Sequence, residues 1–425
     1  MIGSVLGVPK LTQGHLSYAG RAAHLRRLSV LRVIFFDILS GGFWHVRSNL
    51  QNLIVVFIST CISILLVEFI CWGWVNIVRE NHLPRWEYRA TQPPAYKNAG
   101  YFGKTFLRES ENAVTGRLSD VAELDDFTGQ YINVRDGFRV TTDVPDKVSN
   151  RVLLFGGSTL FGQEVPDSET IASYLQRRLT SEGRHLQVMN YGLPGMDSYQ
   201  QLRILQRVPV VPGDIVIFYH GVNDIFYVVF GGAQTGWTAG VPIFRPVQKL
   251  DVFAKWMNEW HKRLKPYSYT ADVALDVYDR SVPRTVTDRG ELSLSVNIAG
   301  ERFAESIERA HRYTVASGAK FLHFLQPTIY DVDEKSDYEE SLLRNYLQTP
   351  PGVDVAFDIG YPKLRKVSLT LQDKGIQFYD ITDSLNSHQD LGEIFLDFCH
   401  INHIGNKIIA DRIFQEYFTN DIGVD

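Results

Sequence analysis

Cysteine is scarce in this chain of 425 residues, with three copies at positions 61, 71 and 399. So few cysteines exclude a disulfide scaffold, and their positions do not form a metal-ligand cluster. A basic excess is also missing, because 43 Lys and Arg stand against 48 Asp and Glu and the formal net charge is −5. Since nucleic-acid-binding proteins normally carry a basic excess, we expect no nucleic-acid partner.

Low-complexity tracts and internal repeats are absent as well. Hydrophobic residues make up 44% of the chain and charged residues 21%, which is ordinary for a globular protein and excludes a disordered or collagen-like chain. The length is too great for one average domain. It therefore predicts one large domain with additional segments.

One long apolar run is present, in residues 53–78. A helix needs about 20 mostly apolar residues to span a membrane, and this run supplies them. It contains one acid, Glu68, which would cost roughly 2.5–3.5 kcal/mol at the centre of a membrane helix. Glu68 lies toward the C-terminal end, near Trp72 and Trp74, which suit a membrane interface. We predict a transmembrane helix over 53–78, with a buried core helix as the alternative.

The segment before this helix, residues 1–52, carries six Lys and Arg and one Asp. Basic residues tend to remain in the cytoplasm, so the charge predicts a cytoplasmic N-terminus and an extracytoplasmic C-terminus. Arg79, Arg85 and Arg89 weaken this asymmetry. A cleavable signal peptide is not expected, because the apolar run starts far from the N-terminus and no small-residue cleavage site follows it.

Residues 25–43 form a second apolar stretch, interrupted by two arginines and one aspartate. Its apolar side chains recur at helical spacing. This pattern predicts an amphipathic helix on the cytoplasmic membrane surface, and a second membrane span is the alternative.

The remainder divides into a linker with a domain entrance, 79–147, and a regular domain, 148–425. Short apolar runs predict strands at 151–155, 186–190, 214–219, 319–325 and 376–379, and helix-like stretches lie at 170–182, 199–208, 299–316, 361–374 and 405–418. Such alternation indicates strands buried on both faces of a mainly parallel sheet. We predict a three-layer α/β/α sandwich, interrupted by inserts at about 226–296 and 329–360.

Chemistry-bearing residues follow the predicted strands, where sites form in open α/β sheets. Four blocks stand out: Gly156-Gly157-Ser158-Thr159, Gly192-Leu193-Pro194-Gly195, Gly221-Val222-Asn223-Asp224 and Asp397-Phe398-Cys399-His400. Taken singly, each block has a plainer interpretation, as a tight turn, a turn glycine, a helix cap or a surface loop. Four blocks in succession favour one composite site.

In this order and spacing, the blocks resemble those of the SGNH (GDSL-type) hydrolase family over about 150–418, without the inserts. One departure is that Gly157 stands where the founding pattern has aspartate. The resulting G-G-S-T form resembles a branch of bacterial, often membrane-anchored members tied to surface-glycan acylation. The resemblance implies a serine hydrolase that needs no cofactor.

The resemblance also implies the roles of individual residues. Ser158 would be the nucleophile, His400 the base that takes its proton, and Asp397 the acid that orients the imidazole. The backbone N–H groups of Ser158 and Gly192 and the side-chain amide of Asn223 would stabilise the oxyanion.

Competing motifs are missing. The absence of G-K-[ST] and of G-x-S-x-G disfavours a P-loop and an α/β-hydrolase elbow. His400 and His403 lie three residues apart, but no third ligand is near them and H-E-x-x-H is absent, so we expect no metal site. Cys399 is interpreted as a packed small residue and His220 as a structural one.

These expectations combine into a membrane-anchored serine esterase or O-acyltransferase. Its substrates would be acyl esters of an envelope glycan on the periplasmic side of a bacterial inner membrane, and acetyl esters are favoured. One alternative is a phospholipase or thioesterase acting on lipid acyl esters, and another is a non-catalytic glycan-binding scaffold. Aromatic residues in the first insert predict either the core of a lid or a sugar-stacking surface over the site.

Overall fold

The computed structural model describes residues 43–75, 99–115, 124–230, 268–270, 273, 285–344, 350–386 and 392–419. The chain forms two compact units. One contains residues 1–76 and 263–274, and the other contains 77–262 and 275–425.

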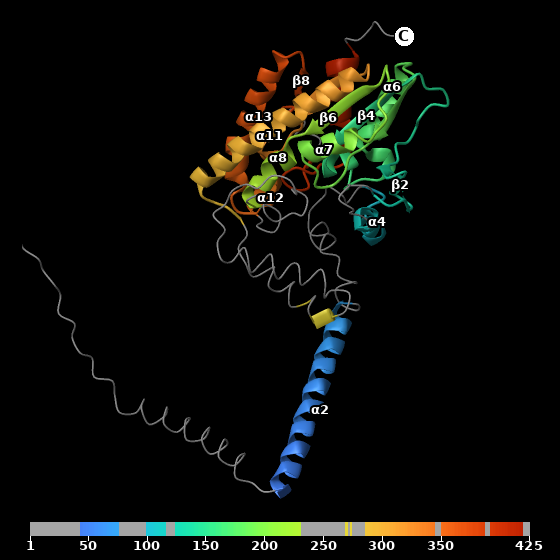
Figure 1. Ribbon diagram of the computed structural model, residues 1–425. Helices are drawn as coiled ribbons and strands as arrows, with labels where there is room; N and C mark the ends of the chain where they lie inside the picture. The colour runs from blue at the N-terminus through green and yellow to red at the C-terminus, as the bar shows by residue number, and fades with distance from the viewer. Residues whose placement is uncertain are drawn as a thin grey trace, which may run out of the picture. The chain divides into compact units, whose positions relative to one another are not determined.

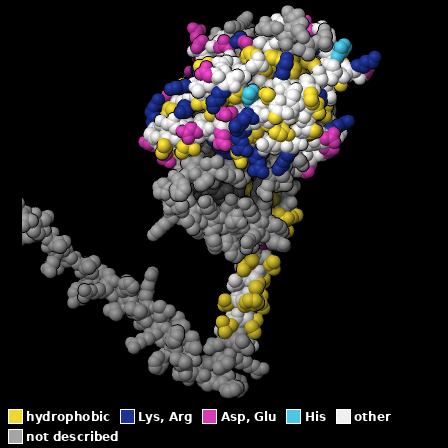
Figure 2. Space-filling model, turned by 45° about the horizontal axis from the view of Figure 1, so that its top comes forward, with side chains coloured by type: hydrophobic (Ala, Val, Ile, Leu, Met, Phe, Trp, Pro, Cys, Tyr) yellow, Lys and Arg dark blue, Asp and Glu magenta, His cyan; other side chains and the backbone are white. Residues whose placement is uncertain are grey.

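The first unit contains one long helix, α2 (Phe43–Gly73). Residues 51–73 of α2 are long and apolar enough to cross a membrane, and their apolar side chains are exposed (Figure 2). The helix begins ten residues before the predicted span and ends five residues before its predicted end. The amphipathic helix predicted for 25–43 lies outside the described residues, except for its last residue.

Glu68 does not stand alone on this apolar helix. Its carboxylate accepts hydrogen bonds from the hydroxyl of Ser268 and the backbone N–H of Thr270, both at 3.1 Å. The backbone N–H of Tyr269 donates to it as well. Three donors from the predicted first insert therefore solvate the acid that interrupts the apolar run.

The second unit is built on an eight-stranded sheet in the order β1-β2-β3-β5-β4-β6-β7-β8 (Figure 1). The strands are β1 (Phe127–Thr128), β2 (Asn133–Arg135), β3 (Phe138–Arg139), β4 (Asn150–Gly156), β5 (Leu186–Asn190), β6 (Ile215–His220), β7 (Lys320–Leu325) and β8 (Gln377–Asp380). Strands β5, β4, β6, β7 and β8 pair in parallel, whereas β1, β2 and β3 pair antiparallel at one edge.

The five parallel strands match the five predicted ones to within one residue at each end. The three antiparallel strands were not predicted, because each is only two or three residues long. They come from the segment that the sequence indicated as the domain entrance, so the sheet itself begins before residue 148.

Helices cover both faces of the sheet. They are α4 (Lys104–Thr115), α5 (Ser158–Phe161), α6 (Ile171–Ser181), α7 (Ser198–Leu205), α8 (Val222–Phe226), α11 (Arg289–Ala316), α12 (Asp337–Arg344), α13 (Val353–Gln372) and α14 (His403–Ile413). Helices α6 and α14 pack together, and α11 packs against α7 and α13 on the other face (Figure 1). The predicted three-layer α/β/α arrangement is confirmed.

Two helices start earlier than their apolar periodicity indicated. Helix α11 begins at Arg289 rather than at 299, because the side chain of Asp288 accepts a hydrogen bond from the backbone N–H of Glu291 and caps it. Helix α13 begins at Val353 rather than at 361 and contains Pro362. Residues at the ends of both predicted inserts therefore belong to these helices.

Two histidines lie in the core between the sheet and α11. The rings of His220, on β6, and His323, on β7, are 5.0 Å apart, and both pack edge-on against Phe303. Their nitrogens have no hydrogen-bond partner in the described part of the protein. Burial lowers the pKa of His323 to about 3 and also lowers that of His220, so both rings are neutral core residues.

The topology fixes where a site can form. From β4 the chain passes to β5 on one side of it and then crosses to β6 on the other side. The carboxyl ends of β4 and β6 therefore flank the point where the strand order reverses, which is where crevices form in open α/β sheets. Ser158 follows β4 and Asn223 follows β6.

Candidate active site

Two glycines bring Ser158 to the end of the sheet. A Cβ at Gly156 would lie 2.6 Å from the carbonyl oxygen of Tyr219 on the neighbouring strand. A Cβ at Gly157 would lie 2.6 Å from Nδ2 of Asn223. Side chains at these positions would push β4 away from β6 and from Asn223. The two glycines therefore let Ser158 start α5 close to Tyr219 and Asn223.

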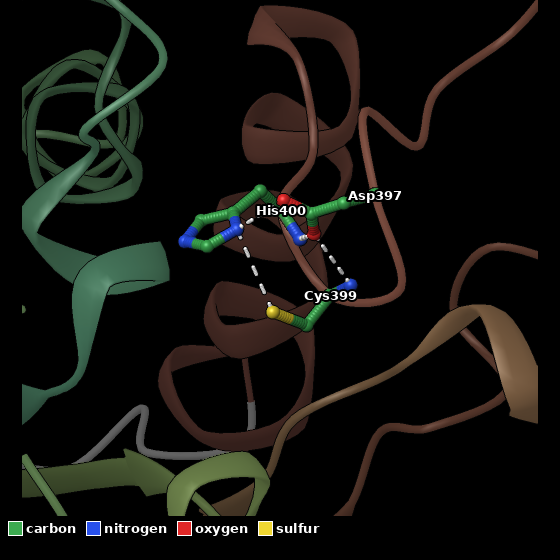
Figure 3. Close-up of side chains that lie close together, drawn as sticks. All are labelled: Asp397, Cys399 and His400. Atoms are coloured by element: carbon green, nitrogen blue, oxygen red, sulfur yellow. Dashed lines mark hydrogen bonds and ion pairs between the residues drawn. The ribbon is translucent and has the colours of Figure 1, made fainter. Parts of the chain in front are cut away.

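The loop Asp397–His400 carries a base and an acid that are already in contact. Nε2 of His400 is 2.7 Å from Oγ of Ser158, and Nδ1 of His400 is 2.7 Å from Oδ2 of Asp397. Figure 3 shows Nδ1 facing Asp397 and the other ring nitrogen pointing away from it. The structure thus brings together the three residues predicted as a catalytic triad.

The loop is fixed by its own backbone. The other oxygen of Asp397, Oδ1, accepts from the backbone N–H groups of Cys399 and His400 at 2.9 and 2.7 Å (Figure 3). The carboxylate is therefore immobilised before it orients the imidazole. The side chains of His400 and Asp397 are only 18% and 13% exposed, which limits competition from water.

Aromatic packing adds a second constraint that the sequence reasoning missed. Phe398 stacks on Phe226 at 5.1 Å and meets Phe357 edge-on at 5.7 Å. Its carbonyl oxygen accepts from the backbone N–H of Ile329 at 3.0 Å. Phe398 thus anchors the loop to the start of each insert and to α13.

The predicted oxyanion donors differ in availability. Among the described residues, the backbone N–H of Ser158 has no acceptor. Asn223 uses one of its two Nδ2 hydrogens on the carbonyl oxygen of Met196, at 2.8 Å, so the other is left for a ligand. The N–H of Gly192, by contrast, donates to Oδ1 of Asn190 at 2.9 Å, so it is already engaged.

A second glycine of the same block lies in a tight turn. Gly195 has a φ of +77°, and the N–H of Met196 donates to the carbonyl of Leu193 at 3.3 Å. With Pro194 at its second position, this is a type II turn, which favours glycine at the third. The N–H of Gly195 finds no acceptor within the described structure. The sequence signal was the Pro-Gly pair itself, which specifies this turn.

The turn lies beside the serine. The carbonyl oxygen of Met196 is 3.7 Å from the Cβ position of Gly157 and accepts from Asn223. These contacts tie the turn that contains Gly195 to Asn223 and bring it next to the residue that precedes Ser158.

A buried charged network supports this side of the site. Asp224 accepts from Oγ and the backbone N–H of Ser198 at 2.5 and 3.2 Å. Asp197 caps α7 through the N–H of Gln200 and lies 3.4 Å from the guanidinium of Arg302. Burial and the neighbouring Asp197 raise the pKa of Asp224 to about 7, and burial raises that of Asp197. Two carboxylates thus share a site with one cation.

Metal-ligand atoms also converge here. Within the described ranges, the ligand atoms of Asp397, Cys399 and His400 all lie within 4.8 Å of one another. Both oxygens of Asp397 are hydrogen-bonded inside the loop, and Sγ of Cys399 is 3.6 Å from Nδ1 of His400. These atoms bond to one another, and Nε2 of His400 is directed at Ser158, an arrangement suited to proton transfer.

Comparisons with known proteins give only distant likenesses. No protein-family model and no curated protein matches the chain. A G-D-S-L lipolytic protein from Veillonella parvula shares 13% identity with a TM-score of 0.36, over 64% of this chain and 100% of that one. A psychrotrophic esterase from Pseudoalteromonas gives 12% and 0.33, over 64% and 100%. A lipase/acylhydrolase from Enterococcus faecalis gives 12% and 0.32, over 63% and 95%. Similarities of this size assign no activity to this chain.

Proposed function

We propose that this chain is a membrane-anchored serine esterase or O-acyltransferase of the SGNH type. One observation carries the proposal. Ser158, His400 and Asp397 form an unbroken hydrogen-bonded series, with 2.7 Å at each of the two contacts of the imidazole. A serine hydroxyl at that distance from an imidazole held by a carboxylate is the arrangement that nucleophilic acyl transfer requires.

The first half-reaction forms an acyl-enzyme. Oγ of Ser158 attacks the carbonyl carbon of an ester while Nε2 of His400 takes the hydroxyl proton. Asp397 stabilises the imidazolium through Nδ1. When the tetrahedral intermediate collapses, His400 returns that proton to the leaving alcohol oxygen, and the acyl group stays on Ser158.

The oxyanion of that intermediate needs preorganised donors. We assign this role to the backbone N–H of Ser158, the remaining Nδ2 hydrogen of Asn223 and the backbone N–H of Gly195, which takes the place predicted for Gly192. Removing one such donor typically costs about 2.7–4 kcal/mol in the transition state.

The second half-reaction decides between the two activities. Water, or a hydroxyl group of an acceptor, gives its proton to His400 and attacks the acyl carbon; His400 then returns that proton to Oγ of Ser158 as the acid or the new ester leaves. Both outcomes use the same residues, so esterase and transferase share this site.

We further propose that residues 53–78, within and beyond α2, anchor the chain, with 1–52 in the cytoplasm, 79–147 as linker and entrance, and 148–425 as the periplasmic catalytic domain. The G-G-S-T block and the basic segment before the helix support this arrangement. Acetyl esters of an envelope glycan are the proposed substrate, and lipid acyl esters are the alternative that the experiment below separates.

The experiment uses the full-length protein in detergent micelles. Release of p-nitrophenol from acetyl and octanoyl esters is measured beside fluorophosphonate labelling. Ser158→Ala should abolish both, whereas Ser181→Ala, which removes an exposed serine hydroxyl on α6, should leave both intact.

Each outcome has a separate meaning. Faster turnover of acetyl than of octanoyl ester supports the glycan substrate, and the reverse supports the lipid one. A rate that rises when a sugar alcohol is added, with formation of its acyl ester, identifies a transferase. Labelling that persists in Ser158→Ala, or is absent from the wild type, rejects the proposal.

A further inference from the structure

Helix α8 and the residue after it contact the Gly195–Ser198 segment through three side chains. Asn223 donates to the carbonyl of Met196 at 2.8 Å, and Asp224 accepts from Ser198. Tyr227, the residue directly after the helix, donates its hydroxyl proton to the carbonyl oxygen of Gly195 at 2.6 Å. Asn223 and Asp224 belong to the G-x-N-D block, whereas the predicted site does not include Tyr227.

The Tyr227 hydroxyl closes over Gly195. A Cβ at Gly195 would lie 2.9 Å from Oη of Tyr227, so the hydroxyl lies directly against the residue whose N–H we assign to the oxyanion. The hydrogen bond fixes the Gly195–Met196 peptide on one side of the Gly195 α-carbon, and the type II turn fixes the Pro194–Gly195 peptide on the other. Together they set the direction of the Gly195 N–H.

The environment keeps this hydroxyl a donor. Tyr227 is largely buried, and its burial together with the Asp197 and Asp224 carboxylates raises its pKa above the ordinary value. The phenol therefore keeps its proton at every pH at which His400 can act as a base, and it donates that proton to the carbonyl of Gly195.

We propose that Tyr227 is a positioning residue for the oxyanion site, acting through the peptide of Gly195 rather than on substrate. This inference rests on the proposed function. It also assigns a task to the first residues of the aromatic insert, because η3 (Tyr227–Phe230) is where that insert leaves α8. The orientation of one oxyanion donor thus depends on how the insert begins.

The test compares Tyr227→Phe with Tyr361→Phe in full-length protein. Tyr361 is the matched control, because its buried hydroxyl also donates to a backbone carbonyl, that of Gln326, at 3.1 Å. Both variants lose one hydroxyl and keep their ring packing. Kinetics with p-nitrophenyl acetate give kcat, KM and the pH profile, and thermal unfolding gives Tm.

We expect Tyr227→Phe to lower kcat roughly tenfold, the effect of one lost buried hydrogen bond on transition-state positioning. KM and the pH midpoint of kcat should not change, because substrate binding and His400 are untouched. Tyr361→Phe should lower Tm by about as much as Tyr227→Phe does, but it should leave kcat unchanged. Substituting 3-fluorotyrosine at position 227, which restores a donor, should restore kcat.

The contrary results are distinct. Equal kcat in Tyr227→Phe and Tyr361→Phe, with Ser158-dependent activity in the wild type, overturns the positioning role alone. A wild type without Ser158-dependent labelling overturns the proposed function, and this inference with it.

Discussion

The two sides of the site are built in opposite ways. On the base side, Asp397 and His400 are three residues apart, and their bonds lie within a single loop. On the oxyanion side, the Gly195–Ser198 segment is held by side chains of α8, by Tyr227 and by Arg302 of α11, all of which come later in the chain. The hydrogen bonds that hold the acid on the base side are therefore local in the sequence, whereas those that hold the oxyanion side come from distant elements.

The difference also appears in electrostatics. The carboxylate of the base side is satisfied by two backbone N–H groups and an imidazole. The oxyanion side buries two carboxylates against one guanidinium and several neutral donors. Substitutions on the base side should change chemistry with little change in folding, while those on the oxyanion side should change both.

The largest effect is expected from the base itself. His400→Ala should lower kcat about 10⁶-fold, as removing the base of a serine triad does. Asp397→Asn should lower it about 10⁴-fold, because an amide cannot stabilise the imidazolium or select its tautomer. Single-turnover acylation measures both, and Tm should remain near the wild-type value. A loss under tenfold in Asp397→Asn would show that the acid has no catalytic part.

The next effect concerns a donor on the other side. Asn223→Ala should lower kcat about 10²–10³-fold and should also lower Tm, since the carbonyl of Met196 loses its partner. Asn386→Ala is the control, because that amide bonds an exposed carboxylate, Asp333, far from these residues in the chain. If Asn223→Ala kept its Tm, the two sides would not differ as we infer.

A pH experiment isolates the buried carboxylates. The pKa of Asp224, about 7 in the folded protein against an ordinary 3.8, means that the folded state holds the proton more tightly than the unfolded state. The stabilisation is complete below the ordinary pKa and is lost as the pH rises through about 7. Asp224→Asn cannot titrate and retains an acceptor for Ser198.

Relative to the wild type, Asp224→Asn should therefore gain free energy of unfolding as the pH rises across this window, on the order of 4 kcal/mol by its upper end, because each unit of pKa shift is worth about 1.4 kcal/mol. Urea unfolding of both proteins at several pH values measures the difference. A difference that does not change with pH would mean that Asp224 is ionised throughout.

The smallest effect is expected at Cys399. Its thiol lies 3.6 Å from Nδ1 of His400, but the carboxylate of Asp397 is closer at 2.7 Å. Cys399→Ala should cost about 1 kcal/mol of stability through lost packing and leave the pH profile of kcat unchanged. A shifted profile would give the thiol a part in setting the basicity of His400.

The same contrast explains what the sequence predicts well. Strands β4 to β8 contain short runs rich in apolar residues, and Asp397 and His400 are spaced within one short motif, so residue order alone predicts both. The short strands β1 to β3 have too few residues for any periodicity. Their pairing is decided by the β5 edge, through the register of Arg139 with Asn190.

The oxyanion side was less predictable for a physical reason. Gly192 and Gly195 belong to one block, and only the hydrogen bond from the N–H of Gly192 to Asn190 removes the first from consideration. Arg302 and Tyr227 have no motif of their own. Arg302 contacts Asp197 and Tyr227 contacts Gly195 only because the fold brings distant elements to one segment, which a linear pattern does not record.

The hydrogen bonds of Glu68 set an order of events during synthesis. Ser268 follows Glu68 by 200 residues, so a ribosome working at about 5–20 residues per second needs roughly 10–40 seconds to deliver it. If α2 enters the bilayer as it is made, its acid must wait that long without these donors. In that case Glu68 gains these donors only after the strands β4 to β6 have left the ribosome, and a chain that stops short of residue 268 would leave its carboxyl group in the bilayer without them.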